Sequence, residues 1–107
     1  SVAGLVSFPI LLSYSASKAA LHSLTQGLRA ALRGEGIQVF GVYPGPVDTD
    51  MAKGIQMEKA PAKDVARAIL DGLAAGTEDI FPDPMAAQMG ALWSKSPKEY
   101  ERAFANL

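Results

Sequence analysis

Tyr14 and Lys18 are the two residues of this 107-residue chain whose types and spacing most directly predict chemistry. They are four positions apart in a stretch rich in Ala and Leu, so a helix places them on one face. A free phenol has a pKa of about 10 and is a poor base at neutral pH. An ammonium about 4 Å away at a partly screened site attracts a phenolate by roughly 4 kcal/mol. This attraction lowers the phenol pKa by roughly two or three units. The pair is therefore compatible with a tyrosine that acts as a general acid or base near pH 7.

The spacing alone also fits an aromatic residue at a helix start followed by a solvated lysine. Two further motifs favour the catalytic interpretation of Tyr14 and Lys18. The segment Ser1-Val2-Ala3-Gly4 lies thirteen residues ahead of Tyr14, and Val42-Tyr43-Pro44-Gly45-Pro46-Val47-Asp48-Thr49 follows the expected helix. Together with Tyr-Ser-Ala-Ser-Lys-Ala-Ala-Leu, their order and spacing resemble the C-terminal half of the short-chain dehydrogenase/reductase family, from Ser1 to about Phe81.

This resemblance implies an oxidoreductase that uses NAD or NADP and interconverts a carbonyl and a secondary alcohol by hydride transfer. Tyr14 then matches the catalytic acid/base. Lys18 matches its electrostatic partner, which also hydrogen-bonds the nicotinamide ribose. Ser1 matches the hydroxyl that donates to the substrate oxygen and steadies its developing charge. The other interpretation of Ser1 is an ordinary hydroxyl at the end of a strand.

Cofactor contacts are expected after the second predicted strand, where ligands bind in open parallel sheets. Pro and Gly fix a turn there that lets main chain approach a flat ring closely. By resemblance, Pro44 and Gly45 lie against the nicotinamide, the main chain of Val47 binds its carboxamide, and the Thr49 hydroxyl reaches the amide or the pyrophosphate. An ordinary Pro-Gly turn is the alternative.

Other candidate residues carry weaker signals. Met51 and Ile55 fit a substrate pocket, because adaptable side chains suit a lid, although local packing explains them equally well. His22 is the single histidine. It lacks partners for a metal site or a catalytic triad, so we expect it on the solvent face of its helix and predict no metal ligand.

Composition excludes several classes of function. The net charge is −1, from 10 basic and 11 acidic residues without a basic stripe, so neither nucleic acid nor a membrane surface is an expected partner. The absence of cysteine excludes disulfides and thiolate metal sites, and we expect a cytoplasmic protein. The expected partners are a small carbonyl or alcohol substrate and a second copy of the chain.

The pattern of elements predicts an α/β fold, the C-terminal part of a Rossmann-like doubly wound parallel sheet, with two to three strands, two main helices and a helical tail. We expect one partial domain over residues 1–107, with a core over 1–81 and a tail over 82–107. The first expected elements are a strand end and the turn after it at Ser1–Gly4, a helix over 13–33 capped by Ser13 and stopped by Gly34 and Gly36, and a strand over 37–43 buried on both faces. A loop or short helix over 49–60 and a helix from Pro61 to Gly76 are expected next, the latter with a core stripe of Val65, Ala66, Ile69, Leu70 and Leu73. A strand over 78–81 and two helical pieces around Pro97 complete the chain.

The helix over 13–33 has an apolar arc wider than one sheet face covers, and a polar strip formed by His22, Gln26, Arg29 and Arg33. We therefore expect it to pack on its own sheet and also on a partner subunit, forming a homo-oligomer. In the tail, aromatic residues such as Trp93, Tyr100 and Phe104 are expected to act as anchors.

The 107 residues contain no Gly-rich phosphate loop of the GxGxxG type. We therefore interpret the sequence as a fragment that holds catalytic side chains and half of a nicotinamide site, and that does not turn over alone. NAD and NADP are not distinguished. The alternative function is a non-catalytic, truncated module that self-associates through the family's helix pair.

Overall fold

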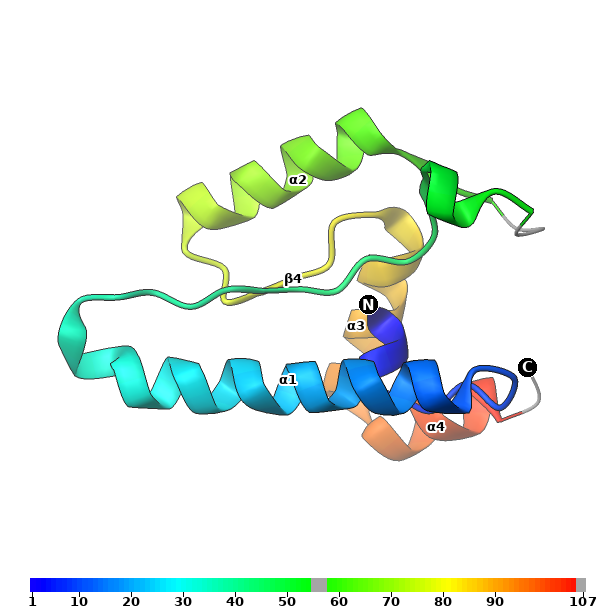
Figure 1. Cartoon of the computed structure of the whole chain (residues 1–107), viewed down its shortest axis with the longest axis horizontal. Helices are drawn as coiled ribbons and strands as arrows, with labels where there is room; N and C mark the ends of the chain where they lie inside the picture. The colour runs from blue at the N-terminus through cyan, green and yellow to red at the C-terminus, as the bar shows by residue number, and fades with distance from the viewer. Residues whose placement is uncertain (55–57, 106–107) are drawn as a thin grey trace.

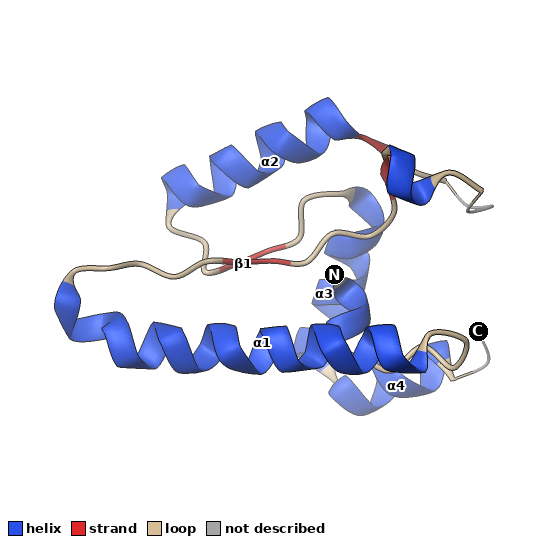
Figure 2. Cartoon of the chain, in the orientation of Figure 1, coloured by secondary structure: helices blue, strands red, loops and turns tan. Residues whose placement is uncertain are grey.

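Two long helices lie on opposite sides of a short parallel strand pair in the computed structural model, which describes residues 1–54 and 58–105 (Figure 1). The helices are α1 (Leu12–Leu32) and α2 (Ala62–Ala75), and the strands are β1 (Gly41–Val42) and β4 (Asp79–Ile80). Figure 2 shows how little of the chain is strand and how much is helix. The other elements are the 3-10 helices η1 (Val2–Gly4), η2 (Arg33–Glu35) and η3 (Asp50–Ala52), the strands β2 (Val47–Asp48) and β3 (Ala60–Pro61), and the terminal helices α3 (Pro84–Lys95) and α4 (Pro97–Phe104).

The strands pair in parallel, as an α/β fold of Rossmann type requires. β1 pairs with β4, and β2 pairs with β3. The predicted strand over 37–43 is wrong in extent, because only Gly41 and Val42 belong to β1. It is also not buried on both faces, since Ile37 is 52 % exposed. Among the described residues, β4 is the one strand beside β1, and it pairs with Gly41 and Val42 only. Residues 37–40 therefore have no strand partner there.

The start of α1 differs from the prediction. Leu11 occupies the N-cap position without a side-chain hydrogen bond, and Ser13 lies inside the helix. Ser15 ties the preceding loop instead, because its buried hydroxyl accepts a hydrogen bond from the Phe8 N–H at 3.1 Å. At the other end the prediction is confirmed: η2 follows α1 and stops at Gly36, which has a φ of 70°.

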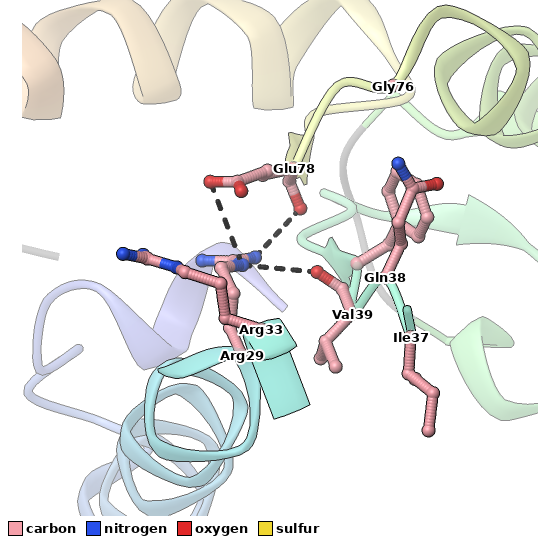
Figure 3. A pocket seen from close by; sticks show the side chains of 8 residues that line it. Arg29, Arg33, Ile37, Gln38, Val39, Gly76 and Glu78 are labelled. Atoms are coloured by element: carbon pink, nitrogen blue, oxygen red, sulfur yellow. Dashed lines mark hydrogen bonds and ion pairs between the residues drawn. The ribbon is translucent and has the colours of Figure 1, made fainter. Parts of the chain in front are cut away.

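Two members of the polar strip of α1, His22 and Arg29, face the sheet, whereas Gln26 and Arg33 are exposed. Arg29 Nε donates to the Val39 carbonyl at 3.1 Å, while Arg29 Nη2 donates to the Glu78 carbonyl at 3.0 Å and to Asp79 at 3.1 Å. Arg29 lines a cavity of about 170 Å³ together with residues 37–40 ahead of β1 and with Gly76 and Glu78 ahead of β4. Figure 3 shows its contacts with Val39 and Glu78. The Glu78 carbonyl also accepts from the Gly41 N–H at 2.8 Å, so Arg29 ties α1 to the backbone just ahead of both β1 and β4, which an apolar side chain cannot do.

His22 also faces inward, so the prediction of a solvent-facing histidine is wrong. Its Nδ1 lies 2.6 Å from the Tyr43 hydroxyl. The edge of its ring packs against Tyr43 and against Trp93 of α3, with ring centres 5.3 Å and 5.7 Å apart. His22 therefore joins α1, the end of β1 and the C-terminal tail.

The second helix begins at Ala62, one residue later than predicted, and ends at Gly76 with a φ of 73°, as predicted. Its core stripe is only partly buried. Val65 is buried, whereas Leu70 is 65 % exposed. The two short strand pairs are too small to cover the whole stripe.

The tail forms two helices around Pro97, as predicted, and anchors on the first residues of the chain. Tyr100 is fully buried, and its hydroxyl donates to the Val2 carbonyl at 3.3 Å. Phe104 stacks on Phe8 with ring centres 5.5 Å apart. The described helices include none with both the length and the apolar character that a bilayer crossing requires.

Tyr100 predicts a loss of stability in alkali. Burial raises the pKa of its phenol to about 12, from about 10 in an unfolded chain. The neutral form is therefore favoured by folding, and its contribution is complete below pH 10 and lost as the pH rises to 12. That loss is about 2–3 kcal/mol. Urea unfolding followed by circular dichroism between pH 8 and 12 measures it.

The matched variant is Tyr100→Phe, which keeps the ring and removes the titrating group. It is expected to lose about 1 kcal/mol at pH 8 with the hydrogen bond to Val2, and to show a shallower fall above pH 10. An equally steep fall in this variant would show that Tyr100 is not the responsible group.

Candidate active site

Three segments that are distant in sequence meet at the carboxyl end of β1. The Val2 N–H donates to the Pro44 carbonyl at 3.2 Å, which joins the first residues to the loop after β1. Gly4 lies directly against α1, because a Cβ on Gly4 would be 2.7 Å from the Lys18 carbonyl oxygen. The segments that carry Ser1, Lys18 and Pro44 are thereby held together.

Tyr14 and Lys18 lie one helical turn apart on α1, and both are half-buried. The Lys18 ammonium lies over the Tyr14 ring, with Nζ 5.4 Å from the ring centre. A cation in this position is attracted by the negative face of the ring.

Ser1 is the N-cap of η1, so the turn predicted for this segment is confirmed, and Ser1 itself is not assigned to a strand. Its Oγ accepts a hydrogen bond from the Ala3 N–H at 3.1 Å. This bond uses a lone pair of the hydroxyl and leaves its proton available for donation.

The main chain of Val47 is oriented away from its partner strand. In the β2–β3 pair Val47 is opposite Ala60, and the Ala60 N–H donates to the Pro46 carbonyl at 3.0 Å. A parallel ladder then uses the residues on either side of Val47, so its own N–H and C=O point to the opposite edge. Its carbonyl is approached there by the Thr49 hydroxyl at 3.5 Å. The strand ladder thus leaves the N–H and C=O of Val47 unused, and a carboxamide needs one donor and one acceptor.

The predicted substrate-pocket residues are not placed near Tyr14 by any described contact. Met51 lies in η3 and is 83 % exposed, so local packing does not explain it. Ile55 lies outside the described residues. Their role in a substrate pocket stays a prediction. Within residues 1–54 and 58–105, no group of three or more His, Cys, Asp or Glu side chains is arranged to hold a metal ion.

Asp83 is a residue that the sequence analysis did not single out. It is a buried carboxylate at the start of α3, and it accepts a hydrogen bond from the Gly45 N–H at 2.8 Å. An Asp directly before a Pro is a recognisable helix-start signal, since Asp favours the N-cap and Pro the first helical position. The signal predicts the cap but not the contact with Gly45.

In a comparison with known protein families, the family model described as short chain dehydrogenase matches residues 1–60. Over 63 residues the chain is 43 % identical to an uncharacterized oxidoreductase of Staphylococcus saprophyticus and 40 % identical to one of Staphylococcus aureus. Each alignment covers 56 % of this chain and 27 % of the relative.

A crystal structure of a short chain dehydrogenase from Burkholderia cenocepacia, in complex with NADP, superposes with a TM-score of 0.88 at 29 % sequence identity. The superposition covers 97 % of this chain and 45 % of the Burkholderia protein. The chain thus spans about half the length of that structure, and its matched part spans about a quarter of the curated relatives.

The contact of Gly4 with α1 predicts a position-specific effect of added volume. Gly4→Ala puts a methyl group against the backbone of Lys18, and rigid backbone on both sides cannot yield cheaply. We expect a loss of about 1–3 kcal/mol in unfolding free energy, measured by urea titration.

Gly27→Ala is the matched control, because a Cβ there has nothing within 4 Å and the residue lies inside α1. It is expected to raise stability by about 0.5–1 kcal/mol. If Gly4→Ala proved as stable as Gly27→Ala, the close approach of residues 1–4 to α1 would be contradicted.

Proposed function

We propose a function from one premise: the chain belongs to the short-chain dehydrogenase family. On this premise it carries the catalytic half of an oxidoreductase that uses NAD or NADP and interconverts a carbonyl and a secondary alcohol. The observation that carries the proposal is the convergence of three segments, joined by the Val2–Pro44 hydrogen bond and by the contact of Gly4 with Lys18. These segments carry the Ser1 hydroxyl, the Tyr14 phenol and the Lys18 ammonium.

Each of the three side chains has a distinct role. In carbonyl reduction, the Tyr14 phenol donates its proton to the substrate oxygen, and in alcohol oxidation the phenolate accepts it back. The Lys18 ammonium, 5.4 Å from the centre of the Tyr14 ring, stabilises the negative charge that forms when the proton leaves. The Ser1 hydroxyl donates a second hydrogen bond to the same substrate oxygen and stabilises charge developing on it.

The cofactor half-site is formed by the loop after β1 and by Lys18. The N–H and C=O of Val47 bind the nicotinamide carboxamide, since the strand ladder leaves both groups unused. Lys18 binds the ribose hydroxyls, and Thr49 lies beside Val47 to bind the amide or the pyrophosphate. When bound, the cofactor supplies or accepts the hydride. The Burkholderia cenocepacia protein was crystallised with NADP, and we propose NAD or NADP for this chain.

We further propose that the 107 residues do not turn over alone. No Gly-rich phosphate loop occurs in the sequence, so the pyrophosphate and adenine lack a binding site. For the experiments below, the Gly-rich N-terminal half of another family member is fused ahead of Ser1. We call this fusion the joined protein. Cofactor titration of the chain and of the joined protein distinguishes a half-site from a complete one.

Tyr14→Phe tests the proposed function in the joined protein. Removing the phenol oxygen removes the proton donor, so kcat for carbonyl reduction is expected to fall by about 10²–10⁴-fold while cofactor affinity is kept. Reduction is followed by loss of NADH or NADPH absorbance over a panel of ketones and aldehydes.

Ser13→Ala is the control, because this hydroxyl is exposed on α1 next to Tyr14. It is expected to leave the rate unchanged. Activity of Tyr14→Phe within about tenfold of the parent would contradict the role of Tyr14 as the acid.

A second function is a self-association module, and a separate observation favours it. One face of α1 carries large apolar side chains exposed to solvent: Leu21, Leu24 and Leu28. Near the start of the same helix, on another side, a hollow of about 350 Å³ is lined by residues 3–7 and by Leu12, Ser15, Ala16 and Ala19. We propose that a second copy of the chain packs here through residues 13–33, because contiguous apolar surface of this kind marks an interface.

Light scattering after size exclusion tests this association at micromolar concentration. The chain is expected to elute as a dimer or larger species, and Leu24→Glu with Leu28→Glu is expected to make it monomeric. Gln26→Glu adds a charge on the exposed polar side of α1 and is expected to change nothing. A monomeric parent chain would contradict the proposal, whereas association without cofactor binding in the joined protein would favour this function over catalysis.

A further inference from the structure

A buried carboxylate lies between the tail and the loop after β1. Asp83 is 5 % exposed and is flanked by Pro82 and Pro84. Its Oδ1 accepts from the Ala86 N–H at 3.0 Å, which caps α3, and its Oδ2 accepts from the Gly45 N–H at 2.8 Å. A buried carboxylate is unfavourable unless its oxygens are hydrogen-bonded. Here one oxygen binds its own helix and the other reaches across to the loop.

The Gly45 N–H belongs to the same peptide unit as the Pro44 carbonyl. That carbonyl accepts from the Val2 N–H at 3.2 Å, while the N–H donates to Asp83. Both polar ends of one peptide plane are therefore fixed, by the segment that carries Ser1 on one side and by the start of α3 on the other. Two hydrogen bonds at opposite ends of a planar unit prevent its rotation.

We propose that Asp83 is a positioning residue that orients the Pro44–Gly45 peptide against the nicotinamide ring. The proposal rests on the proposed function, since it takes this loop as the nicotinamide contact. Asp83 does not touch cofactor or substrate. It acts through Gly45, and it sets the plane on which the ring packs.

The residue type at position 45 supports this role. A Cβ on Gly45 would lie 2.9 Å from Asp83 Oδ1, so any side chain here collides with the carboxylate. Gly45 is not among the glycines with positive φ, so backbone conformation does not require glycine there. The close approach of the Asp83 carboxylate is what requires glycine at this position.

A capping role alone does not account for Asp83. Ser96 caps α4 through a single hydrogen bond, which its hydroxyl accepts from the Glu99 N–H at 3.1 Å. A hydroxyl of that kind suffices for a cap. The second oxygen of Asp83 binds the Gly45 N–H, and helix capping does not explain this second bond.

The first experiment measures the tether without cofactor. Hydrogen exchange of the Gly45 amide is followed by NMR in the chain and in its Asp83→Ala and Asp83→Asn variants. Hydrogen bonds to charged groups are strong, so Asp83→Ala is expected to speed exchange at Gly45 by roughly tenfold or more. Asp83→Asn keeps one acceptor and turns the other into a donor, so it protects either Gly45 or Ala86 but not both.

Ser96→Ala is the matched control, because it removes a helix cap that has no contact with the loop. It is expected to leave Gly45 exchange unchanged while destabilising α4. If Ser96→Ala sped exchange at Gly45 as much as Asp83→Ala, the effect would be general loosening, and the proposal would be overturned. Circular dichroism confirms that each variant is folded, and Asp83→Asn replaces Asp83→Ala if the latter is not.

The second experiment measures the consequence for the nicotinamide. In the joined protein, dissociation constants are determined for NADPH and NADH, and for ADP-ribose, which lacks the nicotinamide. Asp83→Ala is expected to weaken binding of the dinucleotide by about tenfold and to leave ADP-ribose binding unchanged. Equal weakening of both, or of neither, would overturn the positioning role even if the Gly45 tether were confirmed.

These arms separate the two proposals. Failure of the parent joined protein to bind any dinucleotide contradicts the proposed function, and with it the role of Asp83 toward the ring. Binding and turnover in the parent, with an unchanged ratio of dinucleotide to ADP-ribose affinity in Asp83→Ala, contradict the role of Asp83 alone.

Discussion

The backbone of residues 1–4 lies against the backbone of α1, and the candidate site depends on this contact. It requires a residue without a side chain, because a Cβ on Gly4 would overlap the Lys18 carbonyl. The approach sets the distance between the serine at the start of the chain and the lysine on the helix. The same segment then reaches the loop after β1 through the Val2–Pro44 hydrogen bond. The steric contact and the hydrogen bond thus hold Ser1 near segments that follow it by 13 to 43 positions, those of Tyr14, Lys18 and Pro44.

The sheet itself contributes little to this arrangement, since each described strand is two residues long. Side chains that bind backbone groups take over the role of a longer ladder. Arg29 binds two strand-edge carbonyls, Asp83 binds the loop, and Tyr100 binds the first segment. These bonds join α1, the loop and the tail around the site, so the tail stabilises the position of the serine although it lies far from the chemistry.

Local signals in the sequence predicted much of the fold. The Tyr14–Lys18 spacing, the glycine that ends α2 and the proline between the last two helices all act within a few residues, where propensity dominates. The helical wheel failed on α1, because His22 and Arg29 face inward and leucines face out. A wheel assumes that the sheet presents apolar side chains, whereas this sheet edge presents carbonyls and the Tyr43 hydroxyl. The contact of Asp83 with Gly45 spans 38 positions, and no local pattern encodes it.

A crystal structure of the joined protein with a nicotinamide cofactor and a bound ketone or alcohol tests the central claim most directly. That claim is a single oxygen-binding point shared by a serine hydroxyl and a phenol. The account predicts the substrate oxygen within about 3 Å of both Ser1 Oγ and Tyr14 Oη, with the Lys18 ammonium beside the phenol. A substrate oxygen bound by other groups, with either hydroxyl turned away from it, would contradict the account.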